Sequence, residues 1–327
     1  MLKDDCLYIV KEAIARVLPD EAVKRALGGR EFPDGRLILV SVGKAAWSMA
    51  SAAHSVLGTR IDRGIVITKH GYSKGAIGDL SVCEAGHPVP DADTFSATRE
   101  ALELTRGLAP EDTVLFLLSG GGSALFEAPV IPEDELRDIT GQLLACGADI
   151  VEMNTVRKRL SGVKGGRFAR HCAPARVFTV VLSDIIGDPL DMIASGPAYP
   201  DASTCADAVR IAEKYALHLS DAAWAALKTE TPKTLSNTET HITGSVRELC
   251  AAAAGACRKL GYEPQVLTDC LDCEAREAGR FSPRSRGHTR MPAARSPLSR
   301  AGRPSCISPA AAGEGAIRSL HSRRPMA

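Results

Sequence analysis

The stretch that most constrains the fold of this chain is residues 114–125, VLFLLSGGGSAL. Its continuous apolar run predicts a buried strand of a parallel sheet that is covered on both faces. The residues that follow the strand are Ser119, Gly120, Gly121, Gly122 and Ser123. Glycine lacks a Cβ, so this backbone can adopt positive φ values and bring its N–H groups close to an anion. A helix that begins near Ser123 would direct its free N–H groups to the same place. The segment predicts either an anion-binding loop or a ligand-free turn, and it lacks the Gly-Lys-Ser/Thr of a P-loop.

Strand and helix patterns alternate around this segment. The expected strands are residues 36–42, 64–68, 80–84, 113–118 and 176–182, and the expected helices include residues 4–18, 91–108, 132–148 and 203–227. This alternation predicts an α/β fold, with a Rossmann-like, mostly parallel sheet and helices on both faces. Ligands of such sheets bind beyond the carboxyl ends of the strands. Lys44 and residues 86–91 (GHPVPD) follow two of these strands and are therefore expected at that edge.

The chain divides into three parts on its sequence pattern. Residues 1–236 form the first α/β domain, which ends in the polar stretch 229–240. Residues 237–280, with a strand at 241–243, a helix at 246–260, a strand at 264–268 and a helix at 274–279, are expected to begin a second, smaller α/β domain. Residues 281–327 are rich in Arg, Ser, Pro and Ala and contain a single acidic residue, Glu314. That composition predicts a disordered tail.

Length and charge exclude several classes of partner. The chain has 327 residues, which suggests about two domains, and a net charge of +1, which gives no reason to expect nucleic acid or an acidic membrane as a partner. The first residues contain two acids, and no apolar run approaches a membrane span, so we expect a soluble, cytoplasmic protein. The ten cysteines are expected to be structural, including the pair Cys270 and Cys273, for which a redox or zinc site is the alternative.

Two further segments carry candidate chemistry. Residues 152–170 hold six basic side chains, and Lys164, Gly165, Gly166 and Arg167 place cations beside a permissive backbone. This arrangement suits phosphate binding, whereas a solvated basic helix face is the alternative. Asp184 and Asp188 come just after the strand at 176–182 and could hold Mg²⁺, accept a hydroxyl proton, or cap a helix.

Six motifs in the same order resemble those of the glycerate kinases that combine a DUF4147 domain with a C-terminal MOFRL domain, and that are often labelled hydroxypyruvate reductases. The motifs are residues 42–46 (VGKAA), 86–91 (GHPVPD), 118–125 (LSGGGSAL), Asn154 with Arg157-Lys158 and Leu160-Ser161, 164–167 (KGGR), and 183–184 (SD) with 195–197 (SGP). This resemblance covers residues 1 to about 280. It implies ATP-dependent, Mg²⁺-assisted phosphorylation of D-glycerate to 2-phosphoglycerate by a glycerate 2-kinase, and a possible homodimer.

The resemblance also suggests a role for each candidate residue. Lys44 is expected to lie nearest the transferred phosphoryl group or the glycerate carboxylate, and Asp184 and Asp188 are catalytic and metal-binding candidates. The nucleotide-binding candidates are Ser119, Gly120, Gly121, Gly122, Ser123, Lys164, Gly165, Gly166 and Arg167. The substrate-binding candidates are Lys44, Asn154, Arg157 and Ser195. His87 is expected to stabilise a turn rather than to act as a base.

The end of the chain departs from the family pattern. The Gly-Glu-Thr, Gly-Arg-Asn-Gln-Glu and Gly-Thr-Asp-Gly segments of the MOFRL domain do not occur, and the abrupt change near Phe281 is typical of a GC-rich gene translated in a shifted frame. On this view the chain should show little or no kinase activity. Two other classes stay open: an NAD(P)H-dependent hydroxypyruvate reductase, although the Gly-x-Gly-x-x-Gly fingerprint is not found after the first strand, and a non-catalytic truncated product.

Overall fold

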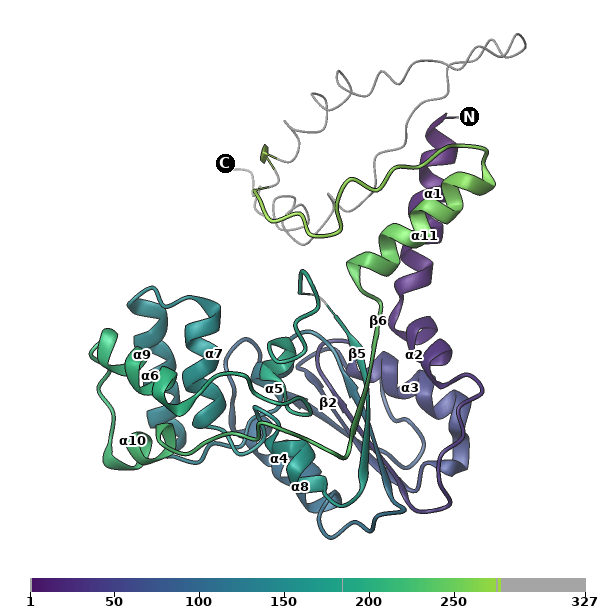
Figure 1. Ribbon diagram of the computed structural model, residues 1–327. Helices are drawn as coiled ribbons and strands as arrows, with labels where there is room; N and C mark the ends of the chain where they lie inside the picture. The colour runs from purple at the N-terminus through teal and green to yellow at the C-terminus, as the bar shows by residue number, and fades with distance from the viewer. Residues whose placement is uncertain (1, 184, 275, 278–327) are drawn as a thin grey trace, which may run out of the picture. The chain divides into compact units, whose positions relative to one another are not determined.

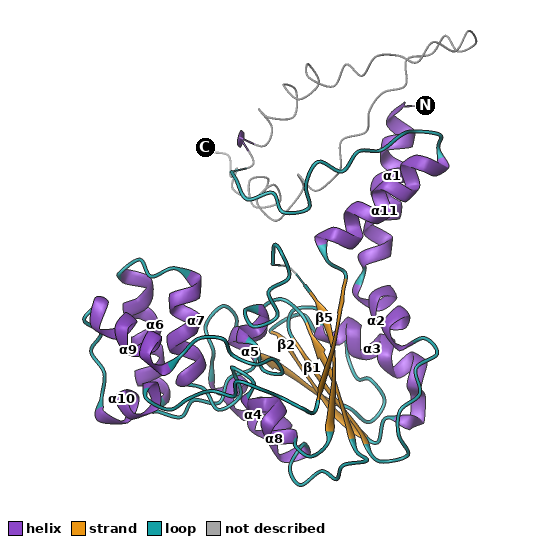
Figure 2. Ribbon diagram, viewed as in Figure 1, coloured by secondary structure: helices purple, strands orange, loops and turns teal. Residues whose placement is uncertain are grey.

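The computed structural model describes residues 2–183, 185–274 and 276–277, and its centre is a six-stranded sheet in the order β3-β2-β1-β4-β5-β6 (Figure 2). The strands are Leu37–Val42 (β1), Arg63–Lys69 (β2), Ser81–Ala85 (β3), Thr113–Leu118 (β4), Arg176–Leu182 (β5) and Thr238–Thr243 (β6). All neighbouring strands pair in parallel. The predicted α/β class with a parallel sheet is confirmed, and five strands lie within two residues of their expected positions.

The central strands are buried on both faces, which is why they are apolar throughout. Every residue of β1 and β4 is buried. Because successive side chains of a strand point to opposite faces, Ile38 and Val40 enter one core while Leu37 and Leu39 enter the other. An alternating apolar and polar pattern is therefore absent from these strands.

Helices cover both faces of the sheet, as predicted (Figure 1). One face packs against α4 (Ala92–Leu104), α5 (Gly122–Leu125) and α8 (Arg167–Cys172). The other face packs against α2 (Pro19–Leu27) and α3 (Ala46–Leu57). Pro19, which was expected to end the first helix, also begins α2, because the first position of a helix needs no backbone N–H donor.

A separate helical layer has its own core. It consists of α6 (Glu133–Ala145), α7 (Ile150–Arg159), α9 (Cys205–Lys214) and α10 (Asp221–Leu227). The single helix expected over residues 203–227 is thus two helices. Ala216 has a φ of 48°, which ends the first, and the Ser220 side chain accepts a hydrogen bond from the Ala223 N–H and caps the second.

The boundary of the main unit differs from the sequence-based expectation. The described residues separate into two compact units, Pro19–Thr243 and residues 2–18 with the described residues between 244 and 277. The strand that was expected to open a second domain at 237–280 is β6, which pairs with β5 in the main sheet. It is an edge strand of mostly half-buried polar residues, so its sequence resembles that of a linker rather than a core strand.

The described part of the second unit is a pair of helices, α1 (Leu2–Val17) and α11 (Val246–Lys259). Ile9 and Ala13 of α1 pack against Ala253, Ala256 and Cys257 of α11. A strand expected at residues 264–268 is not formed, and the tail expected at 281–327 lies outside the described residues. Among the described residues, no helix is both long enough and apolar enough to span a membrane.

Candidate active site

The sheet has one position where the chain reverses its direction of travel across the strands. From β1 the chain proceeds through β2 to β3 on one side, and β4, β5 and β6 follow on the other side. In sheets of this class, the loops on either side of such a position leave a crevice at the carboxyl ends of the strands, where ligands bind. Here the loops after β1 and β4 flank that position. Lys44 lies in the first of these loops and Gly120–Gly121 in the second.

The two loops are joined by hydrogen bonds. The Lys44 N–H donates to the Gly120 carbonyl at 2.9 Å, and the Ala45 N–H donates to the Ser119 hydroxyl at 3.1 Å. Gly43 has a φ of 123°, and a Cβ there would lie 2.2 Å from the Ser119 Oγ, so this approach requires glycine. The buried Ser119 side chain thus fastens one loop to the other, while its predicted contact with nucleotide stays untested.

Gly121 lies between two side chains. Its φ is 88°, and a Cβ at this position would come within 2.9 Å of the His87 ring and 3.2 Å of the Lys44 side chain. Three loops, those after β1, β3 and β4, therefore meet at Gly121. His87 was expected to stabilise a turn rather than to act as a base, and the structure places its ring against the glycine loop. The motif at residues 86–91 is the sequence feature that could have indicated this contact.

The helix predicted to begin near Ser123 is α5, and it is a single turn that begins at Gly122. The N–H groups of Gly122 and Ala124 donate to the carbonyls of Ser119 and Gly121. A helix this short adds little macrodipole, so backbone shape and nearby cations are the features that favour an anion here.

Four of the predicted residues form a continuous network beside α5. The hydroxyls of Ser123 and Ser195 lie 2.9 Å apart, and the Ser195 hydroxyl donates to the Asn154 Oδ1 at 3.0 Å. The Arg157 Nη2 donates to the Ser123 carbonyl at 3.1 Å. Ser195 is fully buried with a φ of 61°, and Ala194 before it has a φ of 51°. Left-handed non-glycine residues are strained, and such residues are concentrated at functional sites.

Residues 164–167 lie behind this network rather than open to a ligand. Lys164 is fully buried, and its ammonium contacts the buried Glu127 carboxylate. The N–H groups of Gly165 and Gly166 donate to the carbonyls of Ser195 and Gly196 at 3.0 and 2.7 Å. Arg167 donates through Nη1 to the backbone carbonyls of Arg159 and Ser161. The Arg167 Nε is buried without a hydrogen-bond partner among the described residues, but the Lys164 ammonium and the Arg167 Nη1 have protein partners. The geometry therefore does not favour direct phosphate contact by these groups.

The basic segment that contains these residues is not a solvated face either. Lys158 and Arg159 of α7 are buried, and each forms an ion pair with the buried Asp201. Burial acts to raise the pKa of Asp201, and the neighbouring Lys158 charge and hydrogen bonds outweigh it and lower the pKa. Asp201 is 42 to 43 residues away in sequence, so no local pattern marks it as the partner.

The metal candidates follow β5. Asp184 lies outside the described residues, and Asp188 is a half-buried residue with a φ of 52°. The nearby Asp191 accepts a hydrogen bond from Lys158 Nζ at 3.4 Å. It lies in none of the sequence motifs. Mg²⁺ in phosphoryl-transfer sites is often held by one or two carboxylates together with the phosphates of the nucleotide. Asp188 is the one of the two metal candidates that the structure describes, and it belongs to no group of three potential ligands among the described residues.

Another group of potential metal ligands lies at the same edge of the sheet. Within the described part of the chain, it is the one group of three such side chains with ligand atoms within 4.8 Å of one another: His70, Asp91 and Asp93. The His70 Nε2 lies 2.8 Å from the Asp91 Oδ2. All three side chains are substantially exposed, and a hydrogen-bonded His–Asp pair accounts for the arrangement without a metal.

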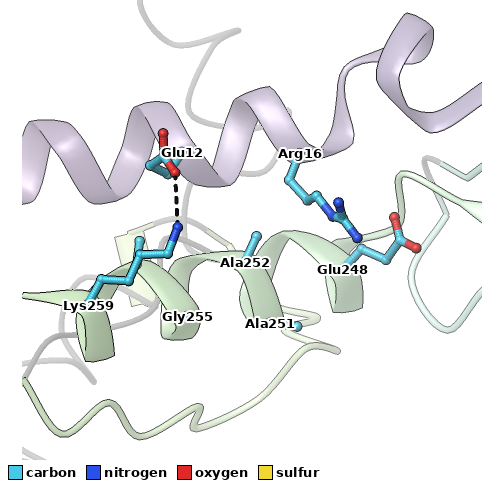
Figure 3. Close-up of a pocket in the computed structure, with 8 residues that line it drawn as sticks. Glu12, Arg16, Glu248, Ala251, Ala252, Gly255 and Lys259 are labelled. Carbon is cyan, nitrogen blue, oxygen red and sulfur yellow. Dashed lines mark ion pairs between the residues drawn. The ribbon is translucent and has the colours of Figure 1, made fainter. Parts of the chain in front are cut away.

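A groove in the second unit contains none of the predicted site residues (Figure 3). Its volume is about 490 Å³, and its walls include Glu12 and Arg16 of α1 and Lys259 of α11, above a floor of alanine and glycine. Glu12 and Lys259 form an ion pair of 3.7 Å across it. The charged side chains that line the groove, Glu12, Arg16, Glu248 and Lys259, belong to none of the sequence motifs, so the candidate site remains at the carboxyl edge of the sheet.

Comparison with known proteins identifies a family for this chain. The family model described as a domain of unknown function, DUF4147, matches residues 5–228. A D-glycerate 2-kinase of Thermotoga maritima is 52% identical over 282 residues, which are 86% of this chain and 67% of that protein. A putative hydroxypyruvate reductase of Agrobacterium vitis is 40% identical, over 83% of this chain and 63% of its own length.

A solved structure agrees with both the fold and the sequence match. The crystal structure of a glycerate kinase from Thermotoga maritima superposes with a TM-score of 0.87 at 49% identity, covering 94% of this chain and 73% of that one. The chain spans about two thirds of the length of the curated relatives it matches. The family match, the sequence identity and the fold agree, and the chain belongs to the DUF4147 family of glycerate 2-kinases.

Proposed function

We propose that the crevice between β1 and β4 binds ATP beside D-glycerate and transfers the γ-phosphoryl group to a glycerate hydroxyl, giving 2-phosphoglycerate. The observation that carries this proposal is the meeting of Lys44 and Gly121 at the switch point of the sheet. The names of the related kinases support the reaction class, and ATP is the phosphoryl donor that this class uses.

The glycine loop suits the nucleotide phosphates. Gly120, Gly121 and Gly122 present backbone without side chains, and Lys44 adjoins them. A phosphoryl group carries most of its charge on oxygens, so catalysis depends on positioning and on charge neutralisation. Lys44 is accordingly assigned to the transferred phosphoryl group.

The second cluster suits the small hydroxy acid. Ser123, Ser195 and Asn154 offer hydroxyl and amide groups, and Arg157 is a half-buried cation beside them. The Nε of Arg157 is buried and has no hydrogen-bond partner among the described residues. A carboxylate is the natural partner of a guanidinium, so we assign Arg157 to the carboxylate of D-glycerate.

The phosphoryl transfer is a nucleophilic substitution at the γ-phosphorus. The glycerate hydroxyl oxygen forms a bond to the γ-phosphorus, the bond from that phosphorus to the ADP oxygen breaks, and the hydroxyl proton leaves. Asp188 is the described carboxylate assigned to receive this proton, and Asp184 is the second candidate. When Mg²⁺ is bound, it neutralises phosphate charge, and Asp188 is its described candidate ligand.

A coupled assay of ADP release tests the proposal. Purified chain is supplied with ATP, Mg²⁺ and D-glycerate, and the product is identified by ³¹P NMR, which separates 2-phosphoglycerate from 3-phosphoglycerate. ADP formation that depends on D-glycerate, together with the 2-phosphate product, is the expected result for the family activity. The expectation of little turnover by this exact chain is tested in the same assay, beside the Thermotoga relative.

The alternatives give different outcomes. A hydroxypyruvate reductase would oxidise NADH in the presence of hydroxypyruvate and leave ATP unchanged. A non-catalytic product would bind an ATP analogue without releasing ADP. NADH oxidation, or binding of neither nucleotide, would refute the proposal.

A further inference from the structure

The buried pair of Lys164 and Glu127 has no role in the site as described so far. Both side chains are fully buried, and the ammonium contacts the Glu127 Oε2. The pair therefore cannot reach a ligand in the crevice. Its position nevertheless places it directly against the segment that carries the glycine loop.

Lys164 holds the end of α5. Its Nζ donates to the Phe126 carbonyl at 3.2 Å, immediately after the last residue of this helix. Arg157 donates to the Ser123 carbonyl of the same helix. Two cations therefore bind carbonyls of a single helical turn that follows the glycines, and hydrogen bonds to charged groups are stronger than those between neutral groups.

The loop that carries Lys164 is attached to both sides of the site. On one side, the Gly162 N–H donates to the Ala128 carbonyl at 2.6 Å, three residues beyond the end of α5. On the other side, the Gly165 N–H donates to the carbonyl of Ser195 at 3.0 Å. The loop thus connects the segment after β4, with the nucleotide candidates, to the turn after β5, with Ser195.

We propose that Lys164 and Glu127 are positioning residues that hold α5 and the preceding glycine loop in the shape that binds the nucleotide phosphates. This inference rests on the proposed function and adds an assignment for a pair that does not touch the ligand. On this proposal Lys164 does not contact the nucleotide directly. It stabilises the glycine loop through hydrogen bonds to the residues that follow it.

The chemistry of the pair is consistent with positioning rather than stability. Burial lowers the pKa of Lys164 to about 8, against the attraction of Glu127 and with the repulsion of Arg157. The Glu127 Oε1 is buried without a hydrogen-bond partner among the described residues. Replacing a buried ion pair with apolar residues of similar size is often neutral or stabilising, so stability alone gives little reason for these two charges.

The test replaces both charges at once, because Lys164→Met alone would leave a buried carboxylate without its cation. Hydrogen–deuterium exchange is compared between the full chain and the double variant K164M/E127L. We expect exchange in residues 119–127 to accelerate about tenfold or more, since hydrogen bonds from a charged group are lost there, while β1 amides keep their protection. A titration with AMP-PNP should then show affinity weakened by about tenfold or more.

The matched control is Asp112→Asn, which removes the ion pair between Arg36 and Asp112 at the amino end of β4. It should leave both exchange at 119–127 and AMP-PNP affinity within about twofold of the parent value, because additivity holds for distant sites. Unchanged exchange at 119–127 in the double variant, or acceleration spread evenly over all strands, would overturn the positioning role. Failure of the parent chain to bind AMP-PNP would instead refute the proposed function, and the exchange comparison would still decide this inference.

Discussion

Lys44 follows β1, and its side chain packs beside Gly121 at the switch point of the sheet. If it neutralises the transferred phosphoryl group, Lys44→Ala should lower ADP release about 10²- to 10³-fold, the range seen when one preorganised charge-stabilising donor is removed. The coupled assay measures this change. Lys24→Ala, on the exposed surface of α2, is the matched control and should keep the parent rate. A Lys44→Ala variant with the parent rate would exclude this assignment.

Gly121 permits a second test at the level of one residue. Gly121→Ala adds a Cβ at a φ of 88° and within 2.9 Å of the His87 ring, so the loop or the ring must move. We expect AMP-PNP affinity to fall about tenfold or more and stability to fall by about 1 kcal/mol, measured by titration and by denaturant unfolding. Gly141→Ala in α6, where a Cβ meets no atom within 4 Å, should instead stabilise the protein by about 0.5–1 kcal/mol. Equal effects of the two substitutions would contradict the close approach at Gly121.

At the scale of elements, the beginning of α4 is held by a charge pair. Asp91 caps this helix by accepting a hydrogen bond from the Thr94 N–H, and its Oδ2 lies 2.8 Å from the His70 ring. Burial opposes ionisation of Asp91, but hydrogen bonds from His70 and Thr94 outweigh it and lower its pKa to about 2. The hydrogen bond to Asp91 is the main reason that the pKa of His70 is raised.

The pH dependence of stability follows from these two shifts. The Asp91 contribution is complete above its ordinary pKa of 3.8 and is lost as the pH falls toward about 2. The His70 contribution is complete below its ordinary pKa of 6.5 and is lost as the pH rises through the raised value. The pair therefore stabilises α4 most between these ordinary values.

His70→Gln should remove this pH dependence on the alkaline side. The variant keeps the Asp91 cap, so the parent and the variant should differ in Tm at pH 5 to 6 and converge as the pH rises through the raised pKa of His70, as read by thermal unfolding. Asp91→Ala also removes the cap and should destabilise α4 by about 1 kcal/mol more. A constant Tm difference between pH 5 and 9 for His70→Gln would show that the His70 charge is not involved.

At the scale of the whole molecule, the described chain has two compact units, each with its own core. Ile9→Ala in α1 removes a buried side chain from the contact with α11 and should destabilise that helix pair by about 2–5 kcal/mol. Hydrogen exchange should accelerate in α1 and α11 while β4 keeps its protection. Ile14→Ala, at a half-exposed position of the same helix, is the control and should change exchange little. Acceleration of β4 to the same extent would show that the two units unfold together.

Much of the main sheet could be predicted from sequence because the physical signal is local. Residues 113–118 and 176–182 are recognisable strands from their continuous apolar runs, and the parallel order follows from the helices between them. The proximity of Lys44 and Gly121 also follows from the class of sheet, since the carboxyl ends of parallel strands share one edge. The strand predicted at residues 241–243 is part of β6, but its pairing with β5 in the main sheet was not predicted, because its residues are mostly half-buried and polar.

The α/β class, the glycine loop and the cations near it can all be read from the amino-acid sequence. Which of those cations have protein partners is visible only in the folded chain. Lys164 and Arg167 look like anion ligands in the sequence, yet Glu127 pairs with the Lys164 ammonium, and the carbonyls of Arg159 and Ser161 accept from the Arg167 Nη1. A local pattern states which charges a segment carries, but burial and pairing depend on residues that folding brings from elsewhere in the chain, and those decide whether a charge is left for a ligand.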